Sequence, residues 1–350
     1  MPNYAASALK AGQTMVSAKY NTPEQRRKNP TVLGLALSNE KNIPNVSELR
    51  KSANRTVEIS YFTNVAPGSA TSKASAHTGT YGDTGMITLA WVTHVETMSL
   101  PRKIGQNNVA SYQEIFNNLY EIKWRNLLKR HDDSALAFLK ANRLQRSAAI
   151  INPLIASANP GVWDETLYGL ILDGSNKPRM AQKMKSFMKA LLYDAPAYDV
   201  IADLQMSDDL EFLRAQGAGN NTNTQAITNG LRVATTQDVV DANMTGGGGL
   251  IMPQGMFAGY SWNDPLNRAG RIDSGETEVG MLGTVADPFG FGAVADISTY
   301  TKRADTSADT TSGSTQDIVD QYELTLTVAY ALPPLSVAGD SVLSLVGSQV

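Results

Sequence analysis

The sequence contains no cysteine. Disulfide bridges, zinc–thiolate sites, iron–sulfur clusters and thiol nucleophiles are therefore excluded. Histidine is almost as scarce, with only His77, His94 and His131, and no two of them have the spacing of metal ligands on a helix face or across a turn. We therefore expect no metal site, with His77 in a polar loop, His94 in a strand and His131 in a charged helical segment.

Long apolar runs are also missing. No stretch approaches the roughly 18 apolar residues of a membrane span, and the first twelve residues lack a basic segment followed by an apolar core. A chain of this kind is expected to be made and used in solution. Charged residues make up 18% of the chain, compared with about 25% in typical soluble proteins. This deficit suggests surface that ends up against other protein.

Motifs that carry chemistry are absent or weak. There is no Gly-x-Ser-x-Gly pentapeptide, and the run Gly246 to Gly249 is not followed by Gly-Lys-Ser/Thr, so a flexible loop is favoured over a phosphate cradle. The carboxylate pairs Asp132-Asp133 and Asp208-Asp209 fit helix N-termini better than acid–base catalysis. We expect no enzyme, no catalytic residue and no cofactor.

The formal net charge of −3 conceals a marked asymmetry. Residues 1–55 carry nine Lys/Arg against three Asp/Glu, a net of +6, and residues 102–146 carry nine against four, a net of +5. Residues 147–350 carry eleven against twenty-three, a net of −12. Such a split is compatible with one face that binds a polyanion, or simply with a solvated basic arm and helix. No base-stacking aromatics are interleaved, so sequence-specific nucleic-acid binding is not expected.

The first 100 residues predict two extensions. Residues 1–55 lack sustained periodicity and are punctuated by four prolines, which predicts an extended arm that is disordered or lies on a neighbour. Alternation from Thr56 to Tyr61 and again from Ile87 to Met98 predicts two strands. The polar stretch from Asn64 to Gly85 between them makes a long protruding hairpin that needs a partner surface.

A long helix over residues 108–146 is the strongest predicted element. Ser111 and Glu114 have capping-box spacing, and a wide apolar stripe follows. The segment His131 to Ser134 is either exposed on this helix or caps a second one. Further helices are predicted over residues 182–193 and 208–216, and strands over residues 200–204, 231–234 and 250–260. Strict alternation from Tyr322 to Leu332 predicts a long strand with one apolar face, ended by Pro333-Pro334.

This order of elements resembles the tailed-bacteriophage major capsid protein family, which has the Hong Kong 97-type fold. DVIADLQMSDDLEFLRAQGAGN, from Asp199 to Asn220, looks like the strand, helix and glycine exit of that family's axial domain. LIMPQGMFAGYSW, from Leu250 to Trp262, looks like its later strand. DQYELTLTVAYALP, from Asp320 to Pro333, looks like the closing strand of its peripheral domain.

The resemblance implies an α+β fold with the following domains. Residues 1–55 would be the N-terminal arm, 56–100 the extended loop, 101–194 and 301–350 the peripheral domain with its spine helix at 108–146, and 195–300 the axial domain. Hexamers and pentamers would close an icosahedral shell around double-stranded DNA, in a virion assembled in the bacterial host cytoplasm. Because Met1 leads directly into the arm, a separate scaffolding protein is expected, with a portal and a decoration protein as further partners. The candidate contacts with other subunits or with DNA are Arg26, Arg27, Lys28, Lys73, His77, Tyr81, Lys123 and Arg130.

Two other readings stay open. An encapsulin-type cellular compartment shell would share the fold but package a cargo protein, and the basic arm favours DNA over that alternative. An enzyme with an unrecognised site is the third hypothesis, against which stands the absence of a convergent acid, base and nucleophile set.

Overall fold

The computed structural model describes residues 4–20, 31–52, 58–62, 84–105, 111–142, 162–164, 197–204, 207, 231–239, 248–264, 279–305, 316–332 and 343–346. The chain divides into two compact units. Unit 1 comprises Met1–Arg55, Ala90–Ala135 and Ala258–Tyr330, and unit 2 comprises Thr56–Leu89, Leu136–Phe257 and Ala331–Val350. Both units combine helices or helical turns with sheet, which agrees with the predicted α+β class.

A sheet of five strands forms the centre of unit 1. Its order is β3-β11-β10-β9, and β8 also pairs with β11. The pairs β3/β11, β11/β10 and β10/β9 are antiparallel. The strands are β3 (Ala90–Pro101), β8 (Ala258–Trp262), β9 (Val279–Ala286), β10 (Val294–Asp305) and β11 (Gln316–Ala331).

Strand β11 was predicted from its alternation, and the structure confirms the strand but corrects its burial. Its side chains alternate between buried and exposed only from Tyr322 to Leu324, whereas every residue from Leu326 to Tyr330 is buried. In this stretch β8 pairs with β11 as a neighbouring strand, and Gly259 of β8 lies so close that a Cβ atom there would be 3.1 Å from the carbonyl oxygen of Ala329.

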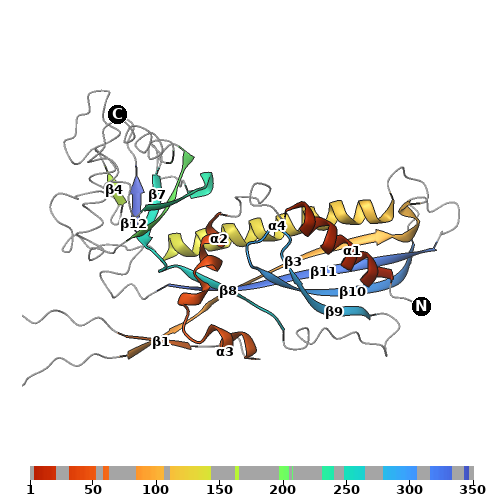
Figure 1. Cartoon of the computed structure of the whole chain (residues 1–350), viewed down its shortest axis with the longest axis horizontal. Coiled ribbons are helices and arrows are strands. Elements are labelled where there is room, and N and C mark those ends of the chain that lie inside the picture. The colour runs from red at the N-terminus through yellow and green to blue at the C-terminus, as the bar shows by residue number, and fades with distance from the viewer. Residues whose placement is uncertain are drawn as a thin grey trace, which may run out of the picture. The chain divides into compact units, whose positions relative to one another are not determined.

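The helix predicted over residues 108–146 is α4 (Tyr112–Ala141), one continuous helix of 30 residues, so no second helix begins at His131 to Ser134, and it lies along the sheet strands in Figure 1. At 1.5 Å per residue it is about 45 Å long. Its apolar stripe repeats every three or four residues, so one face can be buried while the other is exposed. The buried residues of this stripe in unit 1 are Tyr112, Phe116, Tyr120, Trp124, Leu127, Leu128 and Ala135.

The predicted extended arm is wrong for the described part of residues 1–55. These residues form α1 (Tyr4–Lys19), α2 (Thr31–Ser38), the 3₁₀ turn η1 (Glu40–Asn42) and α3 (Val46–Lys51). They also contribute to the core of unit 1, where Ala5, Val32 and Leu33 are fully buried. Short helices that carry few periodic positions of their own are stabilised by tertiary packing, which a periodicity analysis of one segment does not detect.

Unit 2 contains the predicted hairpin. Strands β1 (Glu58–Phe62) and β2 (Thr84–Thr88) pair antiparallel, with Ile59 opposite Ile87, and form a sheet of only two strands. The connection between them lies outside the described residues. The first strand prediction is confirmed. The second, from Ile87 to Met98, overlaps β2 at only two residues, and most of it is β3 in the sheet of unit 1.

A second, mixed sheet of five strands also belongs to unit 2. Its order is β4-β12-β7-β5-β6, with parallel pairs at β4/β12 and β5/β6. The strands are β4 (Val162–Asp164), β5 (Tyr198–Ala202), β6 (Leu231–Thr235), β7 (Gly248–Pro253) and β12 (Leu343–Val346), with the 3₁₀ turn η5 at Gln237–Val239. The predicted strands near residues 200 and 231 are confirmed.

Two predictions about residues 182–300 differ from the structure, and a third falls outside the described residues. The glycine run was expected to be a loop, but Gly248 and Gly249 begin β7, where Gly249 pairs with Ala202 of β5. Residues 258–300 were assigned to the axial domain, but β8, β9 and most of β10 share the sheet of β3 and β11 in unit 1. The helices predicted over residues 182–193 and 208–216 lie outside the described residues.

Candidate functional site: the polar contacts of helix α4

The N-terminus of α4 is closed by the predicted capping box. The backbone N–H and the hydroxyl of Ser111 both donate to Oε2 of Glu114, at 2.7 and 2.9 Å, and the backbone N–H of Glu114 donates to Oγ of Ser111 at 3.3 Å. These hydrogen bonds lower the pKa of Glu114. Since two of the unpaired N–H groups of the first turn are satisfied locally, the start of the helix is fixed by its own sequence.

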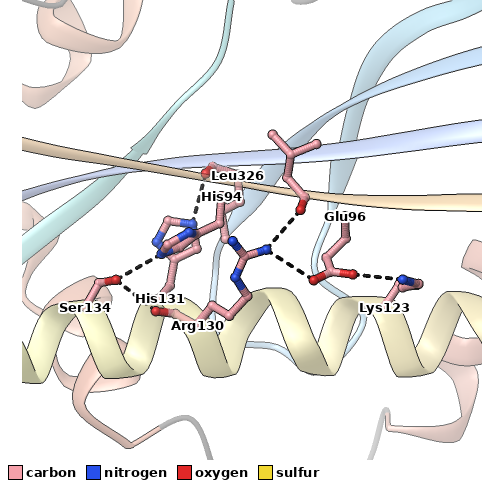
Figure 2. Close-up of polar contacts among 8 residues, drawn as sticks. His94, Glu96, Lys123, Arg130, His131, Ser134 and Leu326 are labelled. Atoms are coloured by element: carbon pink, nitrogen blue, oxygen red, sulfur yellow. Dashed lines mark hydrogen bonds and ion pairs between the residues drawn. The ribbon is translucent and has the colours of Figure 1, made fainter.

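Two of the candidate contact residues, Lys123 and Arg130, meet at one carboxylate. Figure 2 shows both side chains reaching from α4 to Glu96 of β3. The ammonium of Lys123 lies 3.0 Å from Oε2, the guanidinium of Arg130 lies 3.2 Å from Oε1, and Arg130 also donates to the carbonyl oxygen of Val95 at 3.0 Å. Both positive charges are thus used in part to tie α4 to β3 inside unit 1.

The remaining candidate contact residues are not placed. They lie outside the described residues, and their contacts with other subunits or with DNA stay predictions. They are Arg26, Arg27, Lys28, Lys73, His77 and Tyr81.

The two other histidines form a pair between α4 and the sheet (Figure 2), with ring centroids 4.6 Å apart. Nε2 of His131 lies 2.9 Å from the carbonyl oxygen of Leu326, so this nitrogen carries the proton and donates. Nε2 of His94 lies 2.9 Å from Oγ of Ser134, whose own proton goes to the carbonyl oxygen of Arg130. His94 therefore also donates from Nε2.

Burial sets the charge state of this histidine pair. It lowers the pKa of His131 to about 3, helped by the electrostatic effect of the neighbouring His94. Burial also lowers the pKa of His94, followed by the nearby charge of Arg130. His94 was correctly predicted in a strand. The alternative that left the segment from His131 to Ser134 exposed on the helix holds for Asp133 but is wrong for His131, which is fully buried. Neutral, hydrogen-bonded imidazoles in this position stabilise the packing of helix on sheet.

Glu121 of α4 holds the end of helix α1. Its carboxylate accepts a hydrogen bond from the hydroxyl of Tyr20 at 2.6 Å and forms ion pairs with Lys19 at 2.8 Å and with Arg125 at 3.0 Å. Burial alone would raise the pKa of Glu121, but the hydrogen bonds of Lys19 and Tyr20 and the two positive charges outweigh it, and the net shift is downward. The carboxylate therefore stays ionised as an anchor for the N-terminal segment.

Asp132 holds the start of helix α2 in a comparable way. Its Oδ1 accepts the backbone N–H of Leu33 at 2.8 Å, although the two residues are 99 positions apart in the sequence. The N-terminus of α2 is thus capped by a side chain from α4. Asp132 and Asp133 were predicted near a helix N-terminus of their own, but both lie inside α4, and the helix end that Asp132 caps belongs to another segment. The pair Asp208-Asp209 lies outside the described residues.

The loop after β9 also packs against the N-terminal segment. The carboxylate of Asp287 accepts backbone N–H groups from the loop that follows it, which fixes the loop's conformation. The ring of Phe289 then lies edge-on to that of Tyr20, with centroids 4.8 Å apart. The donors are Phe289, Gly290 and Phe291 to Oδ1, and Gly292 and Ala293 to Oδ2.

A further carboxylate, that of Asp320 on β11, is fully buried, and both of its oxygens accept hydrogen bonds. Arg102 of the 3₁₀ turn η2 (Arg102–Gly105) binds it through Nε and Nη2, both at 2.9 Å, Thr301 donates at 2.8 Å, and Tyr112 donates at 3.1 Å. The hydrogen bond to Asp320 raises the pKa of Arg102. This network joins the end of β3, the start of α4 and two strands of the sheet.

These contacts fasten elements together and present no reactive group to a substrate. Within the described ranges there is no cluster of His, Asp and Glu that could hold a metal ion, and no helix there is long and apolar enough to span a membrane. The sequence analysis missed the roles of Glu96, Glu121, Asp287 and Asp320, because each is defined by partners distant in the sequence. A lone acidic residue among apolar or alternating neighbours was the only available signal.

No protein-family model and no curated protein matches the chain. Solved structures of phages do match. A structure from Mycobacterium phage Che8 matches at 11% identity and a TM-score of 0.47, covering 90% of both chains. The capsid of Ralstonia phage GP4 matches at 10% identity and a TM-score of 0.42, covering 85% of this chain and 84% of that one. The capsid of Cyanophage P-SCSP1u matches at 8% identity and a TM-score of 0.41, covering 84% of both. Phage capsids are thus among the structures to which this chain is similar. Because these TM-scores are below 0.5, evidence for the function has to come from the chain's own residues.

Proposed function

We propose that this chain is the major capsid protein of a tailed phage, a structural subunit that assembles as hexamers and pentamers into an icosahedral shell around double-stranded DNA. The proposal starts from the resemblance carried by residues 199–220, 250–262 and 320–333. A capsid subunit needs extended surfaces that contact other copies of the chain, and it needs a rigid body to which these surfaces are attached.

The hairpin β1–β2 is the observation that carries the proposal. A two-stranded hairpin is at best marginally stable in water, since three strands or a packed face are needed for independent stability. β1 and β2 form a sheet without a third strand, and Met86 on β2 is 71% exposed. The polar connection of residues 63–83 adds few apolar side chains. Such a hairpin gains stability when another copy of the chain covers it.

Unit 1 supplies the rigid body. Helix α4 is capped by its own sequence, lies along a sheet with a 16-residue strand, and is tied to that sheet through Glu96, His131 and the Asp320 network. An element fixed at several points between Tyr112 and His131, a stretch of about 30 Å, transmits a displacement at one end of that stretch to the other without bending. This is what a repeating shell requires of each subunit.

Contact with packaged DNA is proposed as nonspecific and carried by the N-terminal segment. Lys123 and Arg130 were candidates, but both form ion pairs with Glu96. The triplet Arg26-Arg27-Lys28 belongs to a segment of net charge +6 and is therefore the stronger candidate for phosphate contacts. A scaffolding protein, a portal and a decoration protein are the partners proposed for assembly in the bacterial host cytoplasm.

An encapsulin-type compartment shell is the alternative, and the contents of the particle separate the two. Purified protein, with and without a scaffolding partner, is imaged by negative-stain electron microscopy, and particle contents are tested for nuclease-protected DNA. Closed shells support the proposal, and protected DNA favours the capsid over a cargo compartment. A chain that stays monomeric at high concentration in both conditions contradicts it.

Deleting residues 66–82 tests the role of the hairpin. The shortened chain is expected to keep the circular dichroism spectrum and cooperative unfolding of the intact subunit but to form few shells, because the deleted stretch is too poor in apolar side chains to stabilise the subunit. An unfolded deletion variant contradicts the assignment of this stretch as an assembly element. Assembly equal to that of the intact chain contradicts its role in subunit contacts.

A further inference from the structure

The sheet of unit 1 has a polar groove on the face turned away from α4. The ring of Tyr322 on β11 contacts Phe116 of α4, and successive side chains of a strand point to opposite faces, so Gln321 and Glu323 point away from the helix. The groove has a volume of about 260 Å³. Its lining includes Met98 and Tyr322, and its other side chains are polar and come from Thr97 and Ser99 of β3, Ser298 and Tyr300 of β10, and Gln321 and Glu323 of β11.

The strand register places three acceptors of this groove in one row. Glu323 is opposite Thr97 on one side and opposite Ser298 on the other. Directly opposite residues have Cβ atoms about 5 Å apart, so the carboxylate is flanked by two hydroxyls within reach of one small group. Glu323 is the only charged residue that lines the groove, and it has no ion pair or hydrogen bond among the described residues. A group that enters the groove meets three oxygen acceptors and one negative charge.

This chemistry selects an ammonium group. An ammonium has three donors and no acceptor, which matches one carboxylate and two hydroxyl oxygens. An anion would be repelled by Glu323, and an apolar ligand would leave the hydroxyls without partners. Pockets for small organic ligands measure roughly 300 to 1,000 Å³, so the groove suits the end of one side chain better than a whole ligand.

We propose that the groove receives a lysine from the N-terminal segment of a second copy of this chain. The proposal rests on the proposed function, which requires contacts between copies. Charge complementarity supports the choice, because residues 1–55 carry a net charge of +6. Lys10 of α1, Lys41 of η1 and Lys51 of α3 are exposed, and none has an acidic partner among the described residues of its own copy. Glu323 is therefore a determinant of subunit contact.

The direct test is zero-length cross-linking of the assembled full-length protein. Equal amounts of ¹⁴N- and ¹⁵N-labelled chain are assembled together and treated with a carbodiimide, which joins a carboxylate to an amine only when the two are in contact. We expect mass spectrometry to find Glu323 joined to one of these three lysines in peptide pairs of mixed isotope content. Pairs within a single isotope only, or no cross-link at Glu323, overturn the proposal.

Charge variants give an independent readout. Glu323→Gln keeps the size of the side chain and is expected to weaken assembly about two- to fivefold per contact and to reduce its salt dependence, as for an exposed ion pair. Glu323→Lys should weaken assembly further, and Lys→Glu at the cross-linked lysine should restore it. Asp133→Asn on α4, an exposed carboxylate outside both the groove and the N-terminal segment, is the matched control.

The outcomes separate this inference from the proposed function. If the unmodified chain does not associate at all, both are wrong. If it forms shells and Glu323→Gln assembles as the unmodified chain does, only the groove assignment is wrong. Loss of assembly with Glu323→Lys that no lysine reversal restores also overturns it, since a merely structural role of Glu323 would show that pattern.

Discussion

Acidification should destabilise unit 1 through His131. This ring is fully buried between α4 and the sheet, and burial lowers its pKa from the ordinary 6.5 to about 3. In the unfolded chain the same ring takes up a proton as the pH falls through 6.5, whereas in the folded chain it stays neutral down to about pH 3. The unfolded state therefore binds more protons throughout this window, and the free energy of unfolding falls with decreasing pH.

The size of the effect follows from the two pKa values. Below pH 6.5 the free energy of unfolding falls by about 1.4 kcal/mol per pH unit for one such group, so the step from pH 7 to pH 5 costs about 2 kcal/mol. Other groups also titrate between these values, and a variant is needed to isolate the contribution of His131. His131→Gln keeps a side-chain N–H that can donate to the carbonyl oxygen of Leu326 but cannot be protonated in this range.

Urea denaturation at pH 7, 6 and 5, followed by tryptophan fluorescence, measures this difference. Three of the four tryptophans, Trp91, Trp124 and Trp262, belong to unit 1, so the signal reports mainly on that unit. The free energy of unfolding of the unmodified chain should fall by about 2 kcal/mol more than that of His131→Gln between pH 7 and pH 5. Equal pH dependence in the two proteins would refute the reasoning, because it would mean that the imidazole is protonated in the folded state or does not titrate on unfolding.

Three further substitutions test the anchors of unit 1 by the same denaturation assay. Gly12→Ala should destabilise it by about 1–3 kcal/mol, because the added Cβ atom would lie 2.5 Å from the ring of Phe116; unchanged stability would mean that α1 does not dock there. Asp132→Ala removes the cap of α2 and should cost about 1 kcal/mol; a variant as stable as the unmodified chain would show that solvent replaces this cap without loss. Asp320→Asn leaves the guanidinium of Arg102 without its carboxylate and should cost about 3 kcal/mol; a loss below 1 kcal/mol would show that the charge at Asp320 contributes little.

The parts of the fold that were predictable are those whose signals are local. The capping box of Ser111 and Glu114 involves residues three positions apart, and its apolar stripe needs only the helical period, so α4 was found with its start correct. Strand β11 was found from alternation alone. The burial of both faces from Leu326 onward was missed, because it depends on tertiary neighbours distant in the sequence, which alternation within the strand does not reveal.

The N-terminal segment was mispredicted because its stability is not local. Helix α2 has only eight residues, and isolated helices of that length are not stable in water. Its cap is Asp132, 99 positions later, and α1 is held by Glu121 about 100 positions later. Within residues 1–55 the sequence shows prolines and weak periodicity, which are equally compatible with an arm that stays extended.

The same anchors change the interpretation of the charge asymmetry. The net charge of +5 over residues 102–146 suggested a basic helix face for DNA, but Lys123 and Arg130 form ion pairs with Glu96, and Arg125 forms one with Glu121. Glu121 is already counted in the +5 and Glu96 offsets one further unit, but the ion pairs engage three basic side chains of the segment within unit 1. The N-terminal segment gives up fewer of its charges in this way, since only Lys19 and Arg50 among its described basic residues form ion pairs. Its remaining positive charge is available for binding outside the subunit, to DNA or to the acidic groove of another copy, and competition between the two would make assembly depend on the DNA present.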